Sequence, residues 1–330
     1  MNQIKVSFYR GKTIESTHVA KILIKDLSGK TILSTGHDNN FIYPRSAIKV
    51  FQAIPFIKSN AVKHFKLNSK SIALASSSHR GETFHIKELN KWIDKIGLNK
   101  NKLQCGIHYP LNKIASDKLL KSNKEVNQLH NNCAGKHLAM ITSCKMNKYK
   151  TSNYLNFNHP HQIKIREIFE KFSNEKIHLR SYGVDGCSAP QYSFKIKDIA
   201  LMLANLIKSY NREFYYSDEI IKLVDSIMSN PKFIGGTDSL DSQIMFIAKN
   251  KIFCKGGAEG VFLFSHLKKR VVGIIKIVDG NERAIPSLVY TIFKKFKIFN
   301  KRELDHLKKI HNFKLINHSN INIGRIETKL

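Results

Sequence analysis

The sequence predicts an α+β fold in which one antiparallel sheet is assembled from both ends of the chain, with helices inserted between them. Alternating apolar and polar residues, typical of strands, occur at residues 4–9, 18–24 and 31–34. Strand-like runs return towards the other end, at residues 251–254, 261–264 and 270–278. The periodicity between these two groups is helical. Because strand-rich ends flank a helical middle, we expect the end segments to pair in one sheet.

Turn residues separate the strand-like segments. Arg10-Gly11 ends the first one, and residues 26–30 join the next two as a hairpin. Asp279-Gly280 marks a turn after the last strand of the second group. About the last 30 residues hold a basic helix and an extended piece at 321–326. This piece is the final strand that the fold class requires.

Helical patterns fill most of the middle of the chain. We expect helices at residues 46–59, 85–96, 161–173, 197–209, 218–228 and 285–299, and another opened by residues 131–137. Residues 98–130 are predicted to be irregular. No repeat and no Pro/Ser-rich linker interrupts the chain. Residues 1–330 are therefore expected to form one domain, with the basic C-terminal part as its extension.

The charge is strongly positive. The formal net charge is +30, from 55 Lys and Arg against 25 Asp and Glu, which permits binding to nucleic acid or to anionic membranes. The lysines are, however, spread along the whole chain among abundant Asn and Ile, a pattern that AT-rich coding produces. No nucleic-acid-binding motif accompanies them. Nucleic-acid binding is therefore kept as an alternative function only.

Cysteine usage and apolar runs favour a soluble cytoplasmic protein without disulfide bonds. The five cysteines are widely spaced, form no Cys-x-x-Cys, and follow an N-terminus without an apolar signal region. We assign Cys105, Cys144 and Cys254 to packing. The longest apolar runs, such as residues 271–275, are far too short to span a bilayer.

A Ser-x-x-Lys motif after Pro44 is the first candidate for chemistry. Ser46 and Lys49 are three residues apart, so in a helix their side chains share one face. A lysine that is partly desolvated can be neutral and take the serine proton, which would make Ser46 an activated nucleophile. The alternative is an ordinary helix start, because this motif is frequent by chance in a Lys-rich chain.

Other segments are also rich in small and reactive residues: 76–82, 131–137 with 184–190, and 255–260. Gly256 and Gly257 indicate backbone that a ligand approaches closely or that adopts positive φ. Lys255 is a candidate partner for a serine elsewhere, with an exposed edge-strand lysine as the alternative. Glu259 is otherwise a solvated turn residue.

Together these segments resemble the layout of serine β-lactamases and penicillin-binding proteins. That layout has Ser-x-x-Lys on a helix, a second serine in a loop, and a Lys-Thr-Gly strand. Here the order is Ser46 with Lys49, then Ser78, then Lys255-Gly256-Gly257. The usual Ser-Asp-Asn element is missing, because His79 and an arginine follow Ser78.

A longer ordered set of motifs resembles the asparaginase II family of the Rhizobium etli inducible type. The set is Arg10-Gly11 with Glu15-Ser16 and His18, Pro-Arg-Ser-Ala-x-Lys at 44–49, Ser-Ser-His at 77–79, Cys105-Gly106 with His108 and Pro110, Asn-Asn-Cys-Ala-Gly-Lys-His at 131–137, Asp-Gly-Cys-x-Ala-Pro at 185–190, Gly-Ala-Glu-Gly at 257–260 and Asp279-Gly280. The motifs cover roughly residues 10–280. The resemblance implies a serine β-lactamase-like fold, hydrolysis of L-asparagine to L-aspartate and ammonia, and a homodimer.

The resemblance also implies roles for individual residues. Ser46 with Lys49 and Ser78 with Lys255 match two catalytic Ser–Lys pairs. Cys133, Lys136 and Cys187 match a zinc site near the catalytic serines, with Asp185 and His137 beside it. Zinc suits two thiolates, whereas lysine must be neutral to bind it. The residues expected around the substrate are Arg45, His79, Gly257, Glu259 and Asp185. Ala134 departs from the family, in which many members have serine.

The sequence therefore predicts an L-asparaginase in which Ser46, deprotonated by Lys49, attacks the side-chain amide of the substrate. Lys255 and Ser78 would protonate the leaving group or position the nucleophile. Which serine forms the covalent bond is open at this point. One alternative is a β-lactamase-like or transpeptidase-like serine acyl enzyme, and the other is the basic nucleic-acid-binding protein.

Overall fold

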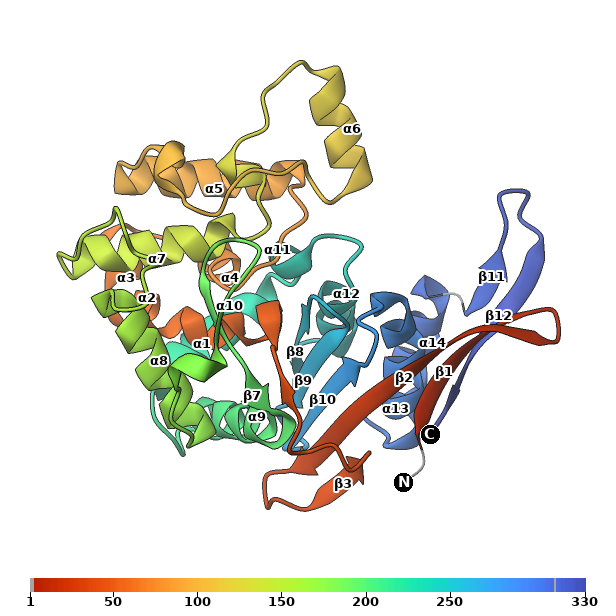
Figure 1. Ribbon diagram of the computed structural model, residues 1–330. Coiled ribbons are helices and arrows are strands. Elements are labelled where there is room, and N and C mark those ends of the chain that lie inside the picture. Colours follow the sequence, from red (N-terminus) through yellow and green to blue (C-terminus); the bar gives the residue numbers. More distant parts are fainter. Residues whose placement is uncertain (1–2, 312) are drawn as a thin grey trace.

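The computed structural model describes residues 3–311 and 313–330 and has one large curled antiparallel sheet (Figure 1). Its strands, in spatial order, are β11 (Lys314–Ile316), β12 (Asn322–Lys329), β1 (Ile4–Arg10), β2 (Thr13–Asp26), β10 (Val271–Ile277), β9 (Val261–His266) and β8 (Ile252–Gly257), and β3 (Thr31–Ser34) pairs with β2. The last strand lies antiparallel to the first, with Val6 opposite Thr328. The prediction that both chain ends build the sheet is confirmed.

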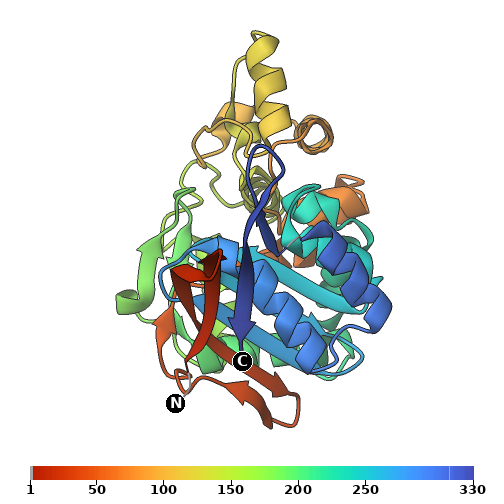
Figure 2. The ribbon, with the colours of Figure 1, turned by 90° about the vertical axis from the view of Figure 1, so that its right-hand side faces the viewer.

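Helices form the middle of the chain, as expected. They are α1 (Lys49–Gln52), α2 (Ile54–Lys58), α3 (Ala61–His64), α4 (Ser69–Leu74), α5 (Thr83–Ile96), α6 (Lys113–Lys121), α7 (Ala134–Met146), α8 (Pro160–Ser173), α9 (Ile196–Tyr210), α10 (Ser217–Ser229), α11 (Lys232–Gly235) and α12 (Leu240–Ala248), followed near the C-terminus by α13 (Ile285–Lys295) and α14 (Lys301–Ile310). Figure 2 shows α13 and α14 in front of the sheet, and α9 packs against β10 and β2. The sheet therefore lies between two helical layers.

Short elements complete the structure. They are the 3₁₀ turns η1 (Arg45–Ile48), η2 (Lys100–Lys102), η3 (Gln128–His130), η4 (Leu179–Ser181) and η5 (Glu282–Ala284), and two small sheets that pair β4 (Phe41–Ile42) with β7 (Phe194–Lys195) and β5 (Tyr182–Val184) with β6 (Pro190–Tyr192). Among the described residues, every helix is too short or too polar to cross a bilayer.

The structure differs from the sequence-based expectation in three segments. The helix expected at 46–59 is broken into η1, α1 and α2. The first break is at Ile48, which has a φ of −100° and a ψ of 12°, and the second comes before Pro55, which has no N–H with which to continue a helix. The irregular stretch 98–130 contains α6, which begins where the Asn112 side chain accepts a hydrogen bond from the Ala115 N–H. Helix α12 was not predicted at all, although its sequence is largely apolar.

Helix α7 carries candidate site residues into the interior. Its residues from Ala134 to Cys144 are all buried, and it packs against α4 without any gap at Gly135. A Cβ atom at Gly135 would lie 2.1 Å from the carbonyl oxygen of Leu74. Glycine is therefore required where α7 meets α4, one residue before Lys136.

Replacing Gly135 by alanine tests this packing. We expect Gly135→Ala to reduce the free energy of unfolding by about 3 kcal/mol, because the backbone of α4 has to move away. Gly97→Ala is the matched control: it has a φ of 58° but open space around it, and should cost about 1 kcal/mol. Urea unfolding measures both, and an equal or smaller loss at Gly135 would contradict the packing described.

Candidate active site

Ser78 lies at the centre of the site, in the loop after α4. The Ser77 N–H donates to the Leu74 carbonyl at 3.0 Å, which ends α4, and the Ser78 N–H donates to the carbonyl of Ile234 at 2.7 Å. The backbone of Ser78 is thus held between α4 and α11. Its side chain is half-buried.

Two lysines approach the same hydroxyl. Lys49 Nζ, from α1, lies 3.0 Å from Ser78 Oγ, 2.5 Å from the Ser77 carbonyl oxygen and 3.2 Å from Cys133 Sγ. Lys255 Nζ, from β8, lies 3.3 Å from Ser78 Oγ. The structure thus brings together three of the four predicted catalytic residues. It places Lys255 beside Ser78, as the second expected pair requires.

The first expected pair has a different geometry. The Ser46 hydroxyl makes no hydrogen bond to any residue in the described part of the chain, and Lys49 Nζ lies 3.0 Å from Ser78 Oγ instead. Ser46 lies in the 3₁₀ turn η1, whose first residue, Arg45, has a φ of 53°. The Lys49 amine is directed to the Ser77 carbonyl oxygen, Ser78 Oγ and Cys133 Sγ. The assumption that three-residue spacing would join Ser46 to Lys49 on one α-helical face therefore does not hold in this conformation.

Lys49 is almost fully buried, and its pKa is lowered from the ordinary value. Burial is the main cause; the nearby Cys133 opposes it, and the positive charges of Lys136 and Lys255 add to it. A lysine with a lowered pKa is neutral over a wider pH range. Lys49 is thus suited to accept a proton from Ser78.

Lys255 has a different partner, the buried carboxylate of Asp241. The distance between Lys255 Nζ and Asp241 Oδ2 is 3.2 Å. Burial alone would raise the pKa of Asp241, but Lys255, Ser239 and the Gly256 N–H outweigh it, and the pKa is lowered. Asp241 was not among the predicted site residues. It lies in the first turn of the unpredicted α12, and no recognised motif includes it.

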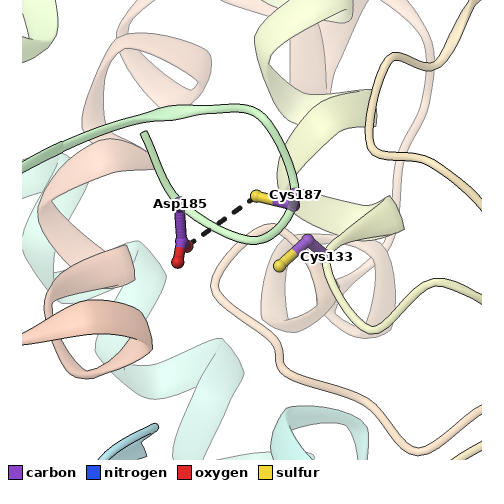
Figure 3. Close-up of side chains that lie close together, drawn as sticks. All are labelled: Cys133, Asp185 and Cys187. Carbon is purple, nitrogen blue, oxygen red and sulfur yellow. Dashed lines mark hydrogen bonds between the residues drawn. The ribbon is translucent and has the colours of Figure 1, made fainter. Parts of the chain in front are cut away.

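A second cluster contains the expected metal ligands. Figure 3 shows Cys133, which precedes α7, facing Asp185 and Cys187 from the loop between β5 and β6. One ligand atom from each of these three residues lies within 4.8 Å of the others. Lys136 Nζ is 3.0 Å from Cys187 Sγ and 3.9 Å from an Asp185 carboxylate oxygen. The three expected ligands, Cys133, Lys136 and Cys187, therefore meet in one place with Asp185, which was expected beside them.

The pKa values of the two thiols are shifted in opposite directions. The hydrogen bond from Cys133 is the main cause that lowers the pKa of Cys187 to about 5, whereas the same bond and burial raise the pKa of Cys133 to about 12. Burial lowers the pKa of Lys136, but Cys187, Cys133 and Asp185 outweigh it, so the net direction is upward. His137 lies behind the cluster, where Nδ1 is 2.6 Å from the Tyr154 hydroxyl.

The donor set suits zinc, because thiolates and a carboxylate are ligands that this ion prefers. Lys136 here donates a hydrogen bond to Cys187. It would have to lose a proton before it could bind a metal. Cys133 and Cys187 are therefore the stronger ligands of the set. Asp185 is a third possible ligand, although the sequence predicted it to lie beside the metal rather than to bind it.

A cavity of about 540 Å³ adjoins this cluster and is lined by charged and aromatic side chains. Arg45 and Asp185 form an ion pair of 2.8 Å on its wall, and Glu259 lines it as expected. Lys276 and Tyr43 also line it and were missed at the sequence level. A lysine within a strand and a lone tyrosine carry no motif that would single them out.

Two residues expected around the substrate, His79 and Gly257, instead contact the loops that carry the candidate serines. His79 is fully buried; its Nδ1 accepts from the Gly81 N–H at 3.2 Å, and its ring stacks on His85. Gly257 allows β8 to approach the chain before α1, because a Cβ there would lie 2.5 Å from the Pro44 carbonyl oxygen. In this conformation both shape the loops that hold Ser78 and Ser46.

A serine hydroxyl within hydrogen-bond distance of two buried lysines is an arrangement typical of enzymes that activate serine with lysine. A model of the L-asparaginase II family matches residues 6–328, and the chain therefore belongs to this family.

Other comparisons add little. No curated protein matches the sequence. A solved structure described as "Crystal Structure Analysis of Mglu in its native form" is similar to this chain, with 12% identity and a TM-score of 0.38. The match covers 84% of this chain and 64% of that one, so the chain spans less than two thirds of its length.

Proposed function

We propose that the protein is an L-asparaginase that hydrolyses the side-chain amide of L-asparagine through a serine activated by lysine. Family membership supports the substrate. The observation that carries the mechanism is the position of Ser78 Oγ between Lys49 and Lys255. A reacting hydroxyl needs a base within about 2.6–3.2 Å, and Lys49 meets this requirement.

In the proposed reaction, neutral Lys49 takes the proton of Ser78 as Oγ forms a bond to the amide carbon. The C–N bond of the resulting tetrahedral intermediate then breaks. The proton held by Lys49 passes to the leaving nitrogen, so ammonia departs and a β-aspartyl ester remains on Ser78. Water attacks the ester, Lys49 accepts a proton from this water, and the proton returns to Ser78 as L-aspartate leaves.

Ser46 is the second candidate for the covalent step. Its hydroxyl is half-buried and free of hydrogen bonds within the described chain, and it follows Arg45, which lines the adjoining cavity. A free hydroxyl can turn towards a substrate. Catalytic hydrogen bonds are often long without substrate. In this second assignment, Lys49 would leave Ser78 and accept the proton of Ser46 when asparagine binds.

The cavity beside Arg45 suits the charged end of an amino acid. Arg45 and Lys276 offer positive charge for an α-carboxylate, and Asp185 and Glu259 offer negative charge for an α-ammonium group. We propose this cavity as the binding site of the zwitterionic part of asparagine.

We further propose a fold of the serine β-lactamase type. The order of Ser46-x-x-Lys49, Ser78 and Lys255 supports it, as does the placement of Lys255 on the edge strand β8 next to η1. A homodimer in the cytoplasm is proposed from the resemblance noted in the sequence, and light scattering of the purified protein would test the dimer.

Ammonia release tests the function. We expect the protein to release ammonia from L-asparagine, and Ser78→Ala to lower kcat by roughly 10³–10⁶-fold. Ser46→Ala should lower it by only about 10-fold, through misplacement of the substrate. Ser76→Ala is the matched control, because this buried hydroxyl has no partner in the described chain. A larger loss at Ser46 than at Ser78 would assign the covalent step to Ser46, and a stable penicillin adduct without ammonia release would support the acyl-enzyme alternative.

The two lysines should respond differently to replacement by arginine. Arginine stays charged and cannot act as a base, so Lys49→Arg should reduce kcat by roughly 10³-fold. Lys255→Arg keeps the positive charge and should cost no more than about 30-fold. Because the pKa of Lys49 is lowered, the unsubstituted enzyme should lose activity only as the pH falls through that lowered value. Equal losses in the two variants would contradict the assignment of the base.

We propose one zinc ion held by Cys133, Cys187 and Asp185, with Lys136 as a further ligand if it is deprotonated. When bound, zinc would supply positive charge that orients the substrate. Elemental analysis of the purified protein should find close to one equivalent of zinc, and Cys187→Ser should remove most of it. Cys144→Ser, a buried thiol in the packed part of α7, is the control and should keep it. Equal zinc contents in both variants would exclude this site.

A further inference from the structure

Asp241 is a buried carboxylate that the proposed reaction does not use. Its side chain is almost completely enclosed, and both of its oxygens have hydrogen-bond donors. Oδ2 accepts from Lys255 Nζ at 3.2 Å and from the Gly256 N–H at 3.1 Å, and Oδ1 accepts from the Ser242 N–H at 2.9 Å. A buried carboxylate with this many donors is held in one orientation and stays ionised.

The segment that carries Asp241 is attached to both sides of the site. The Ile234 carbonyl accepts from the Ser78 N–H. The Thr237 N–H and hydroxyl donate to the Glu82 carboxylate at 2.9 and 2.8 Å. Residues 234–241 therefore connect the Ser78 loop to β8, where Lys255 lies. A substitution at Asp241 is therefore expected to change how Lys255 Nζ is oriented towards Ser78 Oγ.

The hydrogen bonds of Lys255 indicate where the hydroxyl proton of Ser78 points. An ammonium group has three N–H donors, and Lys255 Nζ has three acceptors: Ser78 Oγ at 3.3 Å, Asp241 Oδ2 at 3.2 Å and the Gly256 carbonyl oxygen at 3.2 Å. Ser78 Oγ is then an acceptor towards Lys255. Its own proton is free to point at the other neighbour, Lys49.

Other titratable groups interact with the pair. Glu282, on η5, interacts with Lys255 and Asp241 as well as with Arg80 and Glu259. Cys254, on β8, also interacts with both members of the pair, but burial raises its pKa and keeps the thiol neutral. Lys49, on the helical side, interacts with Lys255 as a like charge. Asp241 is the carboxylate in direct contact with Lys255, so its charge has the largest effect on that amine.

We propose that Asp241 is a positioning residue that holds Lys255 as an ammonium group aimed at Ser78 Oγ, so that Ser78 gives its proton to Lys49. This inference rests on the proposed function. Asp241 touches neither the substrate nor the reacting oxygen. It acts through Lys255, whose charge stabilises the oxygen as it loses its proton.

The test compares Asp241→Asn with Asp241→Glu in steady-state kinetics. We expect Asp241→Asn to lower kcat by roughly 10²-fold with KM changed less than about threefold. Asp241→Glu keeps the carboxylate charge and should recover about tenfold of that loss in kcat, again with KM nearly unchanged.

Glu303→Gln is the matched control, because Glu303 forms an ion pair of 2.6 Å with Lys251 away from the site. It should change stability and leave kcat as it was. If Asp241→Asn fails to fold, Ser239→Ala, which removes a hydroxyl that helps to hold the pKa of this carboxyl low, should give a smaller loss of kcat with KM nearly unchanged. A folded Asp241→Asn that keeps its kcat, or an Asp241→Glu that recovers none of the loss, would overturn the proposal. No ammonia release by the unsubstituted enzyme would instead overturn the proposed function.

Discussion

Two lysine amines share one serine oxygen, and the chemistry of the site depends on how their charges differ. Lys49 Nζ and Lys255 Nζ lie 3.0 and 3.3 Å from Ser78 Oγ, so two positive charges here would repel each other strongly in a buried environment. The partners of the two amines differ. Lys255 contacts the Asp241 carboxylate, whereas Lys49 contacts a carbonyl oxygen and the Cys133 thiol. We propose that this difference in environment lets Lys49 act as the base while Lys255 remains a cation.

The fold creates this contact by close approach of elements that are distant in sequence. Gly257 allows the end of β8 to meet the chain before α1, and Gly135 allows α7 to meet α4. Lys255 reaches Ser78 from the sheet and Lys49 reaches it from α1, while Cys133, at the start of α7, contacts Lys49. The positions of the reactive side chains thus depend on glycine at these two close contacts between elements.

Much of the fold and most members of the site could be predicted from the sequence. Alternation revealed the strands at both ends, and short motifs revealed Ser78, Lys255, Cys133 and Cys187 because their residue types and order are distinctive. The pairing of Ser46 with Lys49 was inferred from helical spacing, which permits such a contact but does not decide it: Lys49 Nζ contacts Ser77, Ser78 and Cys133. Asp241 was missed because its role depends on a tertiary contact with Lys255, and no local pattern encodes such a contact.

We propose that Ser78, placed between the two lysines, is the hydroxyl that becomes acylated. Rapid acid quenching of the enzyme during turnover of L-asparagine, followed by peptide mapping by mass spectrometry, identifies the acylated residue. We expect a β-aspartyl ester on Ser78. An ester on Ser46, with Ser78 unmodified, would show that Ser78 is not the nucleophile.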